Sequence, residues 1–392
     1  MNKLFLSFIS FLLLQSAAFG QSGAVRSSFQ IPLGGEVVAR EQTNDYHPLL
    51  QRVEAPYPGG NSEKAKAMRM KKEIAEKYAK KWENEPIPAH KTIGNSGGGD
   101  PWVGTNFRSN FQINGVPNDN DMAISNDGDI ISVINSNIWM HDSAGTALTN
   151  ISLDNWALPL NIAGNKFDPR ALYDPIHDRF IIACLNGFTD STNYIIVGFS
   201  ETSDPTGNWH LYALPGDPKD DSLWTDYPIM SLNPYELVIT GNLLLNDEPW
   251  QTGFVRSLAW QIDLDSAYAG GTLETTLWDS VYFQGKPIRN LCPIQGGSTP
   301  AGTNTYLLSN RNFATGNDTV WIMEITDTMN APGVQFLVDY GVSDIEYHMP
   351  SNGMQQFMQQ LATNDARWLD GFIENGNIQF VGNTMDTLTG LA

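Results

Sequence analysis

The sequence is poor in cysteine and in long apolar runs. Only two cysteines occur among 392 residues, Cys184 and Cys292, which excludes a fold built on a framework of disulfides. Both lie in apolar segments, and we expect two buried free thiols because free cysteine behaves as a small core side chain. Beyond the N-terminal segment, no apolar run reaches the roughly 20 residues that span a bilayer, so no transmembrane helix is expected there.

The motifs of several large enzyme classes are also missing. The sequence has no G-x-S-x-G nucleophile elbow, no H-E-x-x-H zinc motif and no phosphate-binding loop, and we assign no catalytic residue. The histidines are scattered, and His348, in the segment EYHMPSNG, is the one expected nearest a rim of the fold. It is a candidate ligand-binding residue, with an ordinary loop residue as the alternative.

Basic residues are scarce. The 23 Lys and Arg residues against 43 Asp and Glu residues give a net charge of −20. Such a charge disfavours nucleic acid and anionic membranes as partners. It is compatible with divalent cations or neutral glycans, or simply with solubility outside the cell.

The first part of the sequence predicts export. Residues 1–20 have the pattern of a secretory signal peptide, with Lys3 before the apolar run Leu4–Leu14 and small residues before a cleavage site at Gln21. We therefore predict a secreted protein that is extracellular or held at the cell surface.

Residues 21–101 are predicted to form an N-terminal leader. Gln21–Gly60 has little periodicity and is interpreted as an extended or loosely docked arm. Asn61–Glu85 is the one convincing helix, with a polar cap at its start, a proline directly after it and apolar residues at helical spacing. It is rich in lysine, so it could dock onto the acidic body or lie on a membrane. Asn95–Asp100 is a glycine-rich joint.

The segment Phe167–Leu214 predicts four short strands, at Arg170–Tyr173, Arg179–Leu185, Asn193–Ser200 and Trp209–Ala213. The gaps contain Asp-Pro, Asn-Gly, Ser-Asp-Pro and Thr-Gly-Asn, which favour turns. The two middle strands are almost continuously apolar, which indicates burial on both faces. Four antiparallel strands covered on both faces are typical of a propeller blade packed between two others.

The pattern of this segment recurs along the sequence. Copies begin near Asp119, Phe167, Thr225 and Asn364, and a weaker one ends at Thr305–Asn310. We therefore predict an all-β fold over residues 102–392, a β-propeller of antiparallel four-stranded blades with about five begun. The last copy has only two strands. Either Val103–Phe111 completes a blade, or the propeller belongs to a larger ring in a longer protein, as we predict.

Several of these elements resemble a known group of proteins. The segments PNDNDMAISNDGDIISVINSNI, FDPRALYDPIHDRF, SETSDPTGNWHLY, TDYPIMSLN and NDARWLDGF resemble those of exported bacterial β-propeller proteins of unassigned activity. Such proteins often carry a C-terminal sorting domain read by the type IX secretion system, which is absent from this sequence. The resemblance covers Trp102 to the end. It implies a fold and export, and contributes no catalytic residue.

The repeat also predicts a polar site. The start of the first strand and the end of the second lie at the same end of an antiparallel pair, so the repeated acid and the repeated Asn share one face. Candidate ligand-binding residues at the mouth of the central channel are Asp121, Asp168, Arg170, Asp226, Asp365 and Arg367. They could bind a cation or sugar hydroxyls, or serve architecture by accepting backbone N–H groups. Architecture is our expectation for Asp168, because Pro169 fixes a corner.

Two further features bear on ligands. Asp119 and Asp121 lie in an acid-rich run that offers oxygen ligands for Ca²⁺, and Asp217–Asp221 is similar, but neither has the spacing of an EF-hand. A hairpin turn is the alternative. Trp224 and Trp250 fall between predicted strands and could stack on sugar rings.

These features leave three hypotheses for function. The first is a secreted binding or scaffold module for an extracellular glycan or protein. The second is a glycoside hydrolase or polysaccharide lyase whose rim acids lie about 5 to 10 Å apart. The third is a purely structural surface module.

Overall fold

The computed structural model describes residues 22–42, 104–110, 117–248, 250, 252–314, 316–354, 360–361 and 363–385. The predicted signal peptide, the predicted helix Asn61–Glu85 and the glycine-rich joint lie outside these residues. No helix in the described part is long and apolar enough to cross a membrane.

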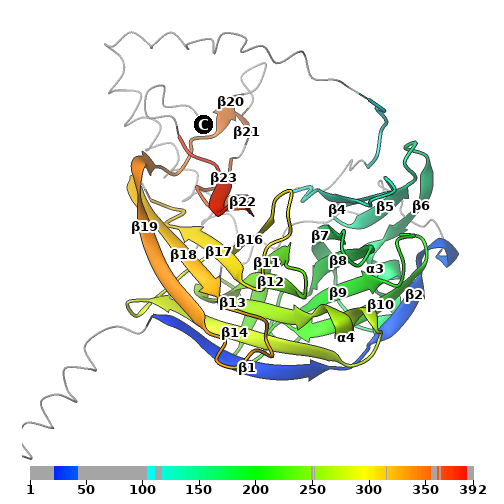
Figure 1. Ribbon diagram of the computed structural model, residues 1–392, viewed down its shortest axis with the longest axis horizontal. Coiled ribbons are helices and arrows are strands. Elements are labelled where there is room, and N and C mark those ends of the chain that lie inside the picture. Colours follow the sequence, from blue (N-terminus) through cyan, green and yellow to red (C-terminus); the bar gives the residue numbers. More distant parts are fainter. Residues whose placement is uncertain are drawn as a thin grey trace, which may run out of the picture.

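The protein is an all-β propeller of antiparallel blades, as predicted, and the described residues form four blades where about five were expected (Figure 1). The first blade contains β3 (Asp121–Ile124), β4 (Ile130–Ile134), β5 (Asn137–His141) and β6 (Ala147–Ser152). The second contains β7 (Lys166–Asp174), β8 (Arg179–Asn186), β9 (Tyr194–Ser200) and β10 (Asn208–Pro215). The third contains β11 (Leu223–Leu232), β12 (Glu236–Leu245), β13 (Phe254–Asp263) and β14 (Leu273–Phe283). The fourth contains β16 (Cys292–Gly296), β17 (Thr305–Asn310), β18 (Asn317–Ile325) and β19 (Phe336–Tyr347).

The continuous apolar runs of the second blade are explained by its two neighbours. Ile181, Ala183 and Leu185 of β8 pack into the core shared with the third blade. Phe180 and Ile182, on the other face of the same strand, pack into the core shared with the first blade. Alternate side chains of one strand thus enter two different cores, so every position is apolar.

Short helices fill the gaps between the blades. The helix α3 (Leu153–Trp156) is capped by the Ser152 hydroxyl and is followed by the 3-10 turn η2 (Leu158–Leu160). It places the Trp156 ring edge-on to Trp209, with centroids 5.9 Å apart. Gly198 is needed beneath this ring, because a Cβ there would lie 2.4 Å from Trp156 Cζ2. The helix α4 (Leu264–Tyr268) bridges β13 and β14.

The N-terminal segment is part of the sheets. Strand β1 (Gly23–Ile31) pairs antiparallel with β14, and β2 (Gly35–Val38), which leads into the 3-10 turn η1 (Ala39–Glu41), pairs with β10. The sequence analysis expected a loosely docked arm here. Residues 23–38 instead form a strap, in which β1 lies along the outer edge of the third blade and β2 along that of the second (Figure 1). Its low apolar periodicity reflects these edge positions, where backbone hydrogen bonds rather than core contacts hold the chain.

The fifth copy of the repeat forms a hairpin, β22 (Trp368–Glu374) and β23 (Asn377–Gly382), as predicted. Strand β22 pairs in parallel with β16, which extends the sheet of the fourth blade to six strands. After β23 the chain turns away, and Met385 is buried against Met349. Residues 104–110 form no strand, and Asn110 bonds the first blade, so they do not complete this hairpin.

Three short strands lie outside the blades. Strand β15 (Lys286–Pro287) pairs with β14, and β20 (Gly353–Met354) pairs with β21 (Gln360–Leu361). Both cysteines are free and buried, as the sequence predicts.

Candidate functional site

Three of the repeated asparagines hold the backbone of the repeat that follows, whereas Asn186 and Asn383 donate to backbone carbonyls of their own repeat. Asn135 accepts the N–H of Asp168 through Oδ1 at 2.7 Å, and Asn242 accepts the N–H of Asn290 at 2.9 Å. Asn310 donates to the carbonyl of Ala366 at 2.6 Å. In each case an asparagine at the end of a second strand holds the backbone that enters the next inner strand. These amides are therefore architectural.

Two inner strands, β7 and β11, each have a β-bulge near the start of the strand, close to the axis of the propeller. The register shifts between Phe167 and Arg170 in β7 and between Asp226 and Ile229 in β11. Asp168 and Tyr227 have φ values of 49° and 59°, although each precedes a proline, which normally favours extended backbone. Bulges of this kind re-aim side chains, and here they direct polar side chains toward the axis.

Three of the acids face one another at this point. The carboxyl of Asp119 bonds that of Asp168, and the charges of Asp119 and Asp226 act on Asp168. Burial, reinforced by these neighbours, raises the pKa of Asp168 well above its ordinary value. Burial also raises the pKa of Asp119 and Asp226. A close pair of carboxyls cannot ionise together without repulsion, so the pair retains a proton above the ordinary range.

The other predicted acids are engaged in structure. Asp121 accepts the N–H of Ala171, on the next blade, at 3.2 Å, which is the architectural role considered for these acids. Asp365 accepts Nε and Nη2 of Arg367, each at 2.7 Å, and both side chains are buried. Arg367 lowers the pKa of Asp365 despite its burial. This pair neutralises itself and leaves little charge for a ligand.

The arginines of the axis are held by aromatic rings. The guanidinium of Arg367 lies 4.2 Å from the centroid of Tyr227, and that of Arg170 lies 5.9 Å from it. Arg289 lies 5.5 Å from the ring of Trp250 and donates to the carbonyl of that residue. Burial and the neighbouring Arg367 lower the pKa of Arg289 to about 10. The axis of the propeller is thus filled by Asp, Arg and aromatic side chains that contact one another.

Three predicted ligand-binding residues are covered to different degrees. Trp224 is 1% exposed and packs near Phe188, so its ring is closed to a sugar. Trp250 is half-buried, stacks on Phe313 and lies beside Arg289. His348 is 3% exposed, and its backbone N–H donates to the hydroxyl of Thr384.

The acidic runs do not assemble a metal centre in the described residues, where no group of three His, Cys, Asp or Glu side chains could hold an ion. Asp119 is bonded to Asn135, and Asp121 to backbone N–H groups. Asp221 is 2.8 Å from Arg256. The Ca²⁺ hypothesis thus gains no support from the donor geometry here.

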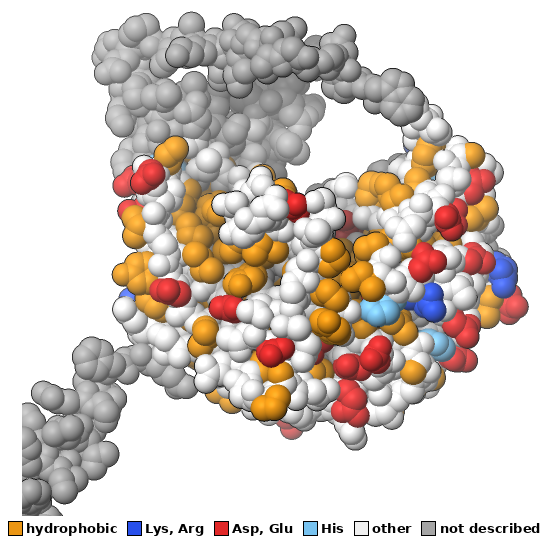
Figure 2. Space-filling model, viewed as in Figure 1, with side chains coloured by type: hydrophobic (Ala, Val, Ile, Leu, Met, Phe, Trp, Pro, Cys, Tyr) orange, Lys and Arg blue, Asp and Glu red, His pale blue; other side chains and the backbone are white. Residues whose placement is uncertain are grey.

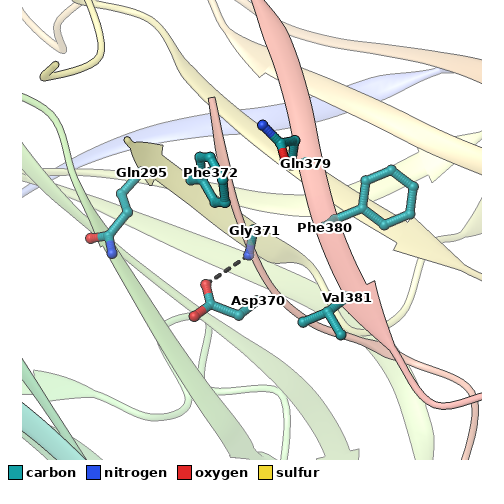
Figure 3. Close-up of a pocket in the computed structure, with 7 residues that line it drawn as sticks. All are labelled: Gln295, Asp370, Gly371, Phe372, Gln379, Phe380 and Val381. Carbon is teal, nitrogen blue, oxygen red and sulfur yellow. Dashed lines mark hydrogen bonds between the residues drawn. The ribbon is translucent and has the colours of Figure 1, made fainter. Parts of the chain in front are cut away.

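A pocket of about 390 Å³ lies beside the axis, between β16 and the hairpin β22–β23 (Figure 3). Gln295, Phe372 and Gln379 are direct partners across three strands, so the ring of Phe372 stands between two amides on one face of the sheet. Asp370 lies on the same face, and its charge adds to the burial that raises the pKa of Asp121. Phe372 is 39% exposed.

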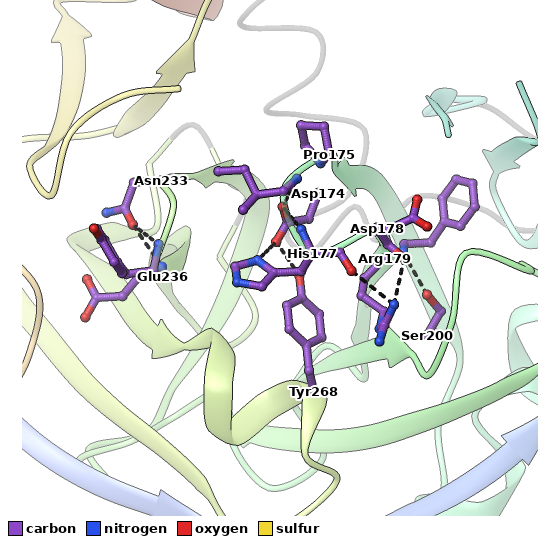
Figure 4. A network of polar contacts seen from close by, with 12 residues as sticks. Asp174, Pro175, His177, Asp178, Arg179, Ser200, Asn233, Glu236 and Tyr268 are labelled. Atoms are coloured by element: carbon purple, nitrogen blue, oxygen red, sulfur yellow. Dashed lines mark hydrogen bonds and ion pairs between the residues drawn. The ribbon is translucent and has the colours of Figure 1, made fainter. Parts of the chain in front are cut away.

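A second pocket of about 260 Å³ lies at the C-terminal ends of the inner strands β7, β11 and β16 and shares Gln295 with the first pocket. It is lined by residues 173–176, 232–233, 295–298 and Pro300. The turns beside it are held by the polar network of Figure 4. Asp174 accepts Nδ1 of His177 at 2.7 Å and the hydroxyl of Tyr268, from the third blade, at 2.8 Å. Asp174 also accepts two backbone N–H groups, so this network joins two blades.

The lining of the larger pocket escaped the sequence analysis. Gln295, Asp370, Phe372 and Gln379 were not predicted as site residues, whereas the axial acids were. A usable signal was present, because the fifth copy has Phe372 and Phe380 in two short strands separated by a turn.

Comparison with known proteins identifies no family. No protein-family model matches the chain, and no curated protein matches it. Among solved structures, the chain is similar to a subtype N11 neuraminidase-like protein of A/flat-faced bat/Peru/033/2010, with a TM-score of 0.33, 12% identity and 67% of each chain covered.

Two exo-β-1,3-galactanases are similar at the same level. For the enzyme from Phanerochaete chrysosporium the TM-score is 0.33 and the identity 6%, with 69% of this chain and 57% of that one covered. For the enzyme from Clostridium thermocellum the values are 0.32 and 11%, with 64% and 53% covered. The matched part thus spans little more than half of each galactanase. At this level of similarity we transfer neither residue roles nor activity.

Proposed function

We propose that the chain is an exported propeller that binds an extracellular glycan in the pocket between β16 and β22–β23. The observation that supports this most directly is the row Gln295–Phe372–Gln379, in which an accessible aromatic ring stands between two amides. Export is proposed from the N-terminal sequence alone.

The chemistry of the pocket suits a sugar ring. The apolar face of a pyranose packs on an aromatic face, while its hydroxyl groups need both donors and acceptors at the edges. The side-chain amides of Gln295 and Gln379 offer both, and the carboxylate of Asp370 adds an acceptor. Asp370 already accepts the N–H of Gly371 at 2.7 Å, which fixes its orientation (Figure 3).

A hydrolase is less well supported by the same geometry. Glycosidases use two carboxyls separated by about 5 to 10 Å, with room for water or the sugar between them. Asp119 and Asp168 instead bond each other directly, and the remaining axial acids are paired with backbone or arginine. We therefore propose binding without bond cleavage.

The test is a glycan array with the secreted protein, followed by calorimetry with each glycan that binds. Phe372→Ala should weaken binding about five- to tenfold, since stacking on one aromatic ring is worth about 1 to 1.5 kcal/mol. Tyr235→Ala is the matched control, because Tyr235 is 55% exposed in the turn between β11 and β12, outside the pocket.

Three results would count against the proposal. They are the absence of any bound glycan, equal weakening by Tyr235→Ala, and release of reducing sugar from a bound oligosaccharide. The last would favour the hydrolase. Thermal melts of both variants separate lost binding from lost folding.

A further inference from the structure

The outermost strand of the fourth blade is long and open to solvent. Strand β19 has 12 residues and contains no proline. Its apolar side chains are unusually exposed, 51% for Tyr340, 65% for Val342 and 78% for Ile345. Figure 2 shows apolar and acidic side chains together along the left rim, where Figure 1 places β19. Natural proteins normally shorten, cover or bend such an edge.

The same molecule shows how an edge of this kind is covered. The outer strand β14 of the third blade pairs with β1, and the outer strand β10 of the second pairs with β2. Both added strands are extended, antiparallel and distant in sequence from the blade that they join. In the described part of the chain, β19 ends its sheet without such a strand. The fourth blade therefore offers the backbone edge that β1 and β2 occupy on its neighbours.

The charge along β19 restricts what can pair there. Asp339, Asp344 and Glu346 are all exposed. Strand β19 pairs regularly with β18 from Phe336 to Val342 and is bulged between Val342 and Tyr347, so Asp339 lies in the regular part of the edge and Asp344 in the bulge. A strand with lysine or arginine opposite these positions gains favourable cross-strand pairs, whereas like charges directly opposite are destabilising. A second copy of β19 would place acid against acid, and each whole chain carries a net charge of −20.

We propose that β19 accepts an extended, basic segment of a partner protein as an added, antiparallel outer strand. Backbone hydrogen bonds supply the affinity, and the alternation of apolar and acidic side chains selects a strand of apolar and basic residues. This surface belongs to the outer edge of the fourth blade, whereas the pocket beside the axis contacts its inner strand, so the inference is independent of glycan binding.

The probe is a labelled synthetic peptide, Lys-Val-Lys-Thr-Val-Thr-Val-Lys-Val. In an antiparallel arrangement one lysine would face Asp339, and two lysines would lie beside the bulge that carries Asp344 and Glu346. We expect saturable binding to the full chain by fluorescence anisotropy, weakened at least tenfold when glutamate replaces the lysines. Hydrogen exchange should show new protection of amides in β19 and none in β1. Added salt should weaken binding, since exposed charges are screened.

Variants of the protein complete the test. The double variant Asp339→Lys, Asp344→Lys should weaken the lysine peptide at least tenfold and improve binding of the glutamate peptide. The control is Glu201→Lys, an exposed acid in the turn between β9 and β10, which should change neither. Equal binding of both peptides, protection outside β19, or no binding at all would overturn the proposal. A dimer that the double variant abolishes would assign this edge to a second copy instead.

Discussion

The carboxyl groups of Asp119 and Asp168 bond each other across the boundary between the first and second blades. Asn135 fixes both residues, because its amide donates to Asp119 Oδ2 and accepts the N–H of Asp168. Burial raises the pKa of Asp168 well above 3.8, and the nearby Asp119 and Asp226 raise it further. The folded protein therefore keeps a proton that the unfolded chain releases near pH 4.

Replacing Asp168 tests the consequence of this raised pKa. A group that binds its proton more tightly when folded contributes stability at low pH, and this contribution is lost as the pH rises above the unfolded pKa toward the folded one. The free energy of unfolding of Asp168→Asn should therefore fall less between pH 4 and pH 8 than that of the wild type. At pH 7 the variant should be at least as stable as the wild type.

Urea unfolding across this pH range gives the comparison, with Glu201→Gln, at an exposed acid, as control. A uniform loss of about 1 to 3 kcal/mol at every pH would show that the carboxylate accepts backbone bonds instead, as the sequence led us to expect.

The ion pair of Asp365 and Arg367 should be a point of high sensitivity. Both side chains are buried, with exposures of 1% and 5%. Asp365→Ala leaves a buried guanidinium without its carboxylate, which costs about 3 to 5 kcal/mol. The double variant Asp365→Leu, Arg367→Met removes both charges and should be clearly more stable than the single one. Chemical denaturation of the wild type and the two variants measures this, and a double variant no more stable than Asp365→Ala would contradict the prediction.

The raised pKa of Glu236 leads us to expect a second pH dependence of the stability. Burial raises its pKa from 4.5 to about 7, although Met329 N–H and Gln261 Nε2 donate to it. Stability should therefore decrease as the pH rises from about 4.5 to 7, by on the order of 3 kcal/mol. Glu236→Gln lacks this ionisation, so its stability should vary less over this interval. Parallel slopes for the two proteins would show that Glu236 is ionised throughout.

The two cysteines should resist modification. Burial raises the pKa of Cys184 and of Cys292 to about 12, and the thiolate is the reactive form. In a colorimetric assay at pH 8, the native protein should release no chromophore over hours, while denatured protein should titrate both thiols. Rapid labelling of either residue in the native state would contradict the buried placement.

The sequence predicted the blades well because their signals are local. In the second blade, the predicted strand Arg179–Leu185 corresponds to β8 (Arg179–Asn186), and Asn193–Ser200 to β9 (Tyr194–Ser200). Turn residues such as Asp-Pro and Thr-Gly-Asn act through their own backbone preferences. The two buried thiols were predicted for a similar reason, since each cysteine lies in an apolar run of the sequence.

The candidate site was predicted only in part. The spacing of the repeat predicted that Asp168 and Asp226 lie near the axis. It could not show that Asp365 forms an ion pair with Arg367 or that Trp224 is buried. A tryptophan between strands looks accessible in a sequence, because exposure depends on what packs over it. Phe372, which the sequence analysis passed over, is 39% exposed, because no strand in the described residues pairs with the free edge of β23.

The sequence alone thus determined the strands, the turns and the repetition of blades, which depend on residues close together in the chain. Only the tertiary structure decided how distant segments pair. Phe29 lies opposite Thr275 in the strap, and Gln295 lies opposite Phe372 beside the axis. Such pairings arise from backbone hydrogen bonds at sheet edges, which any non-proline sequence can supply, so no local pattern of side chains specifies them.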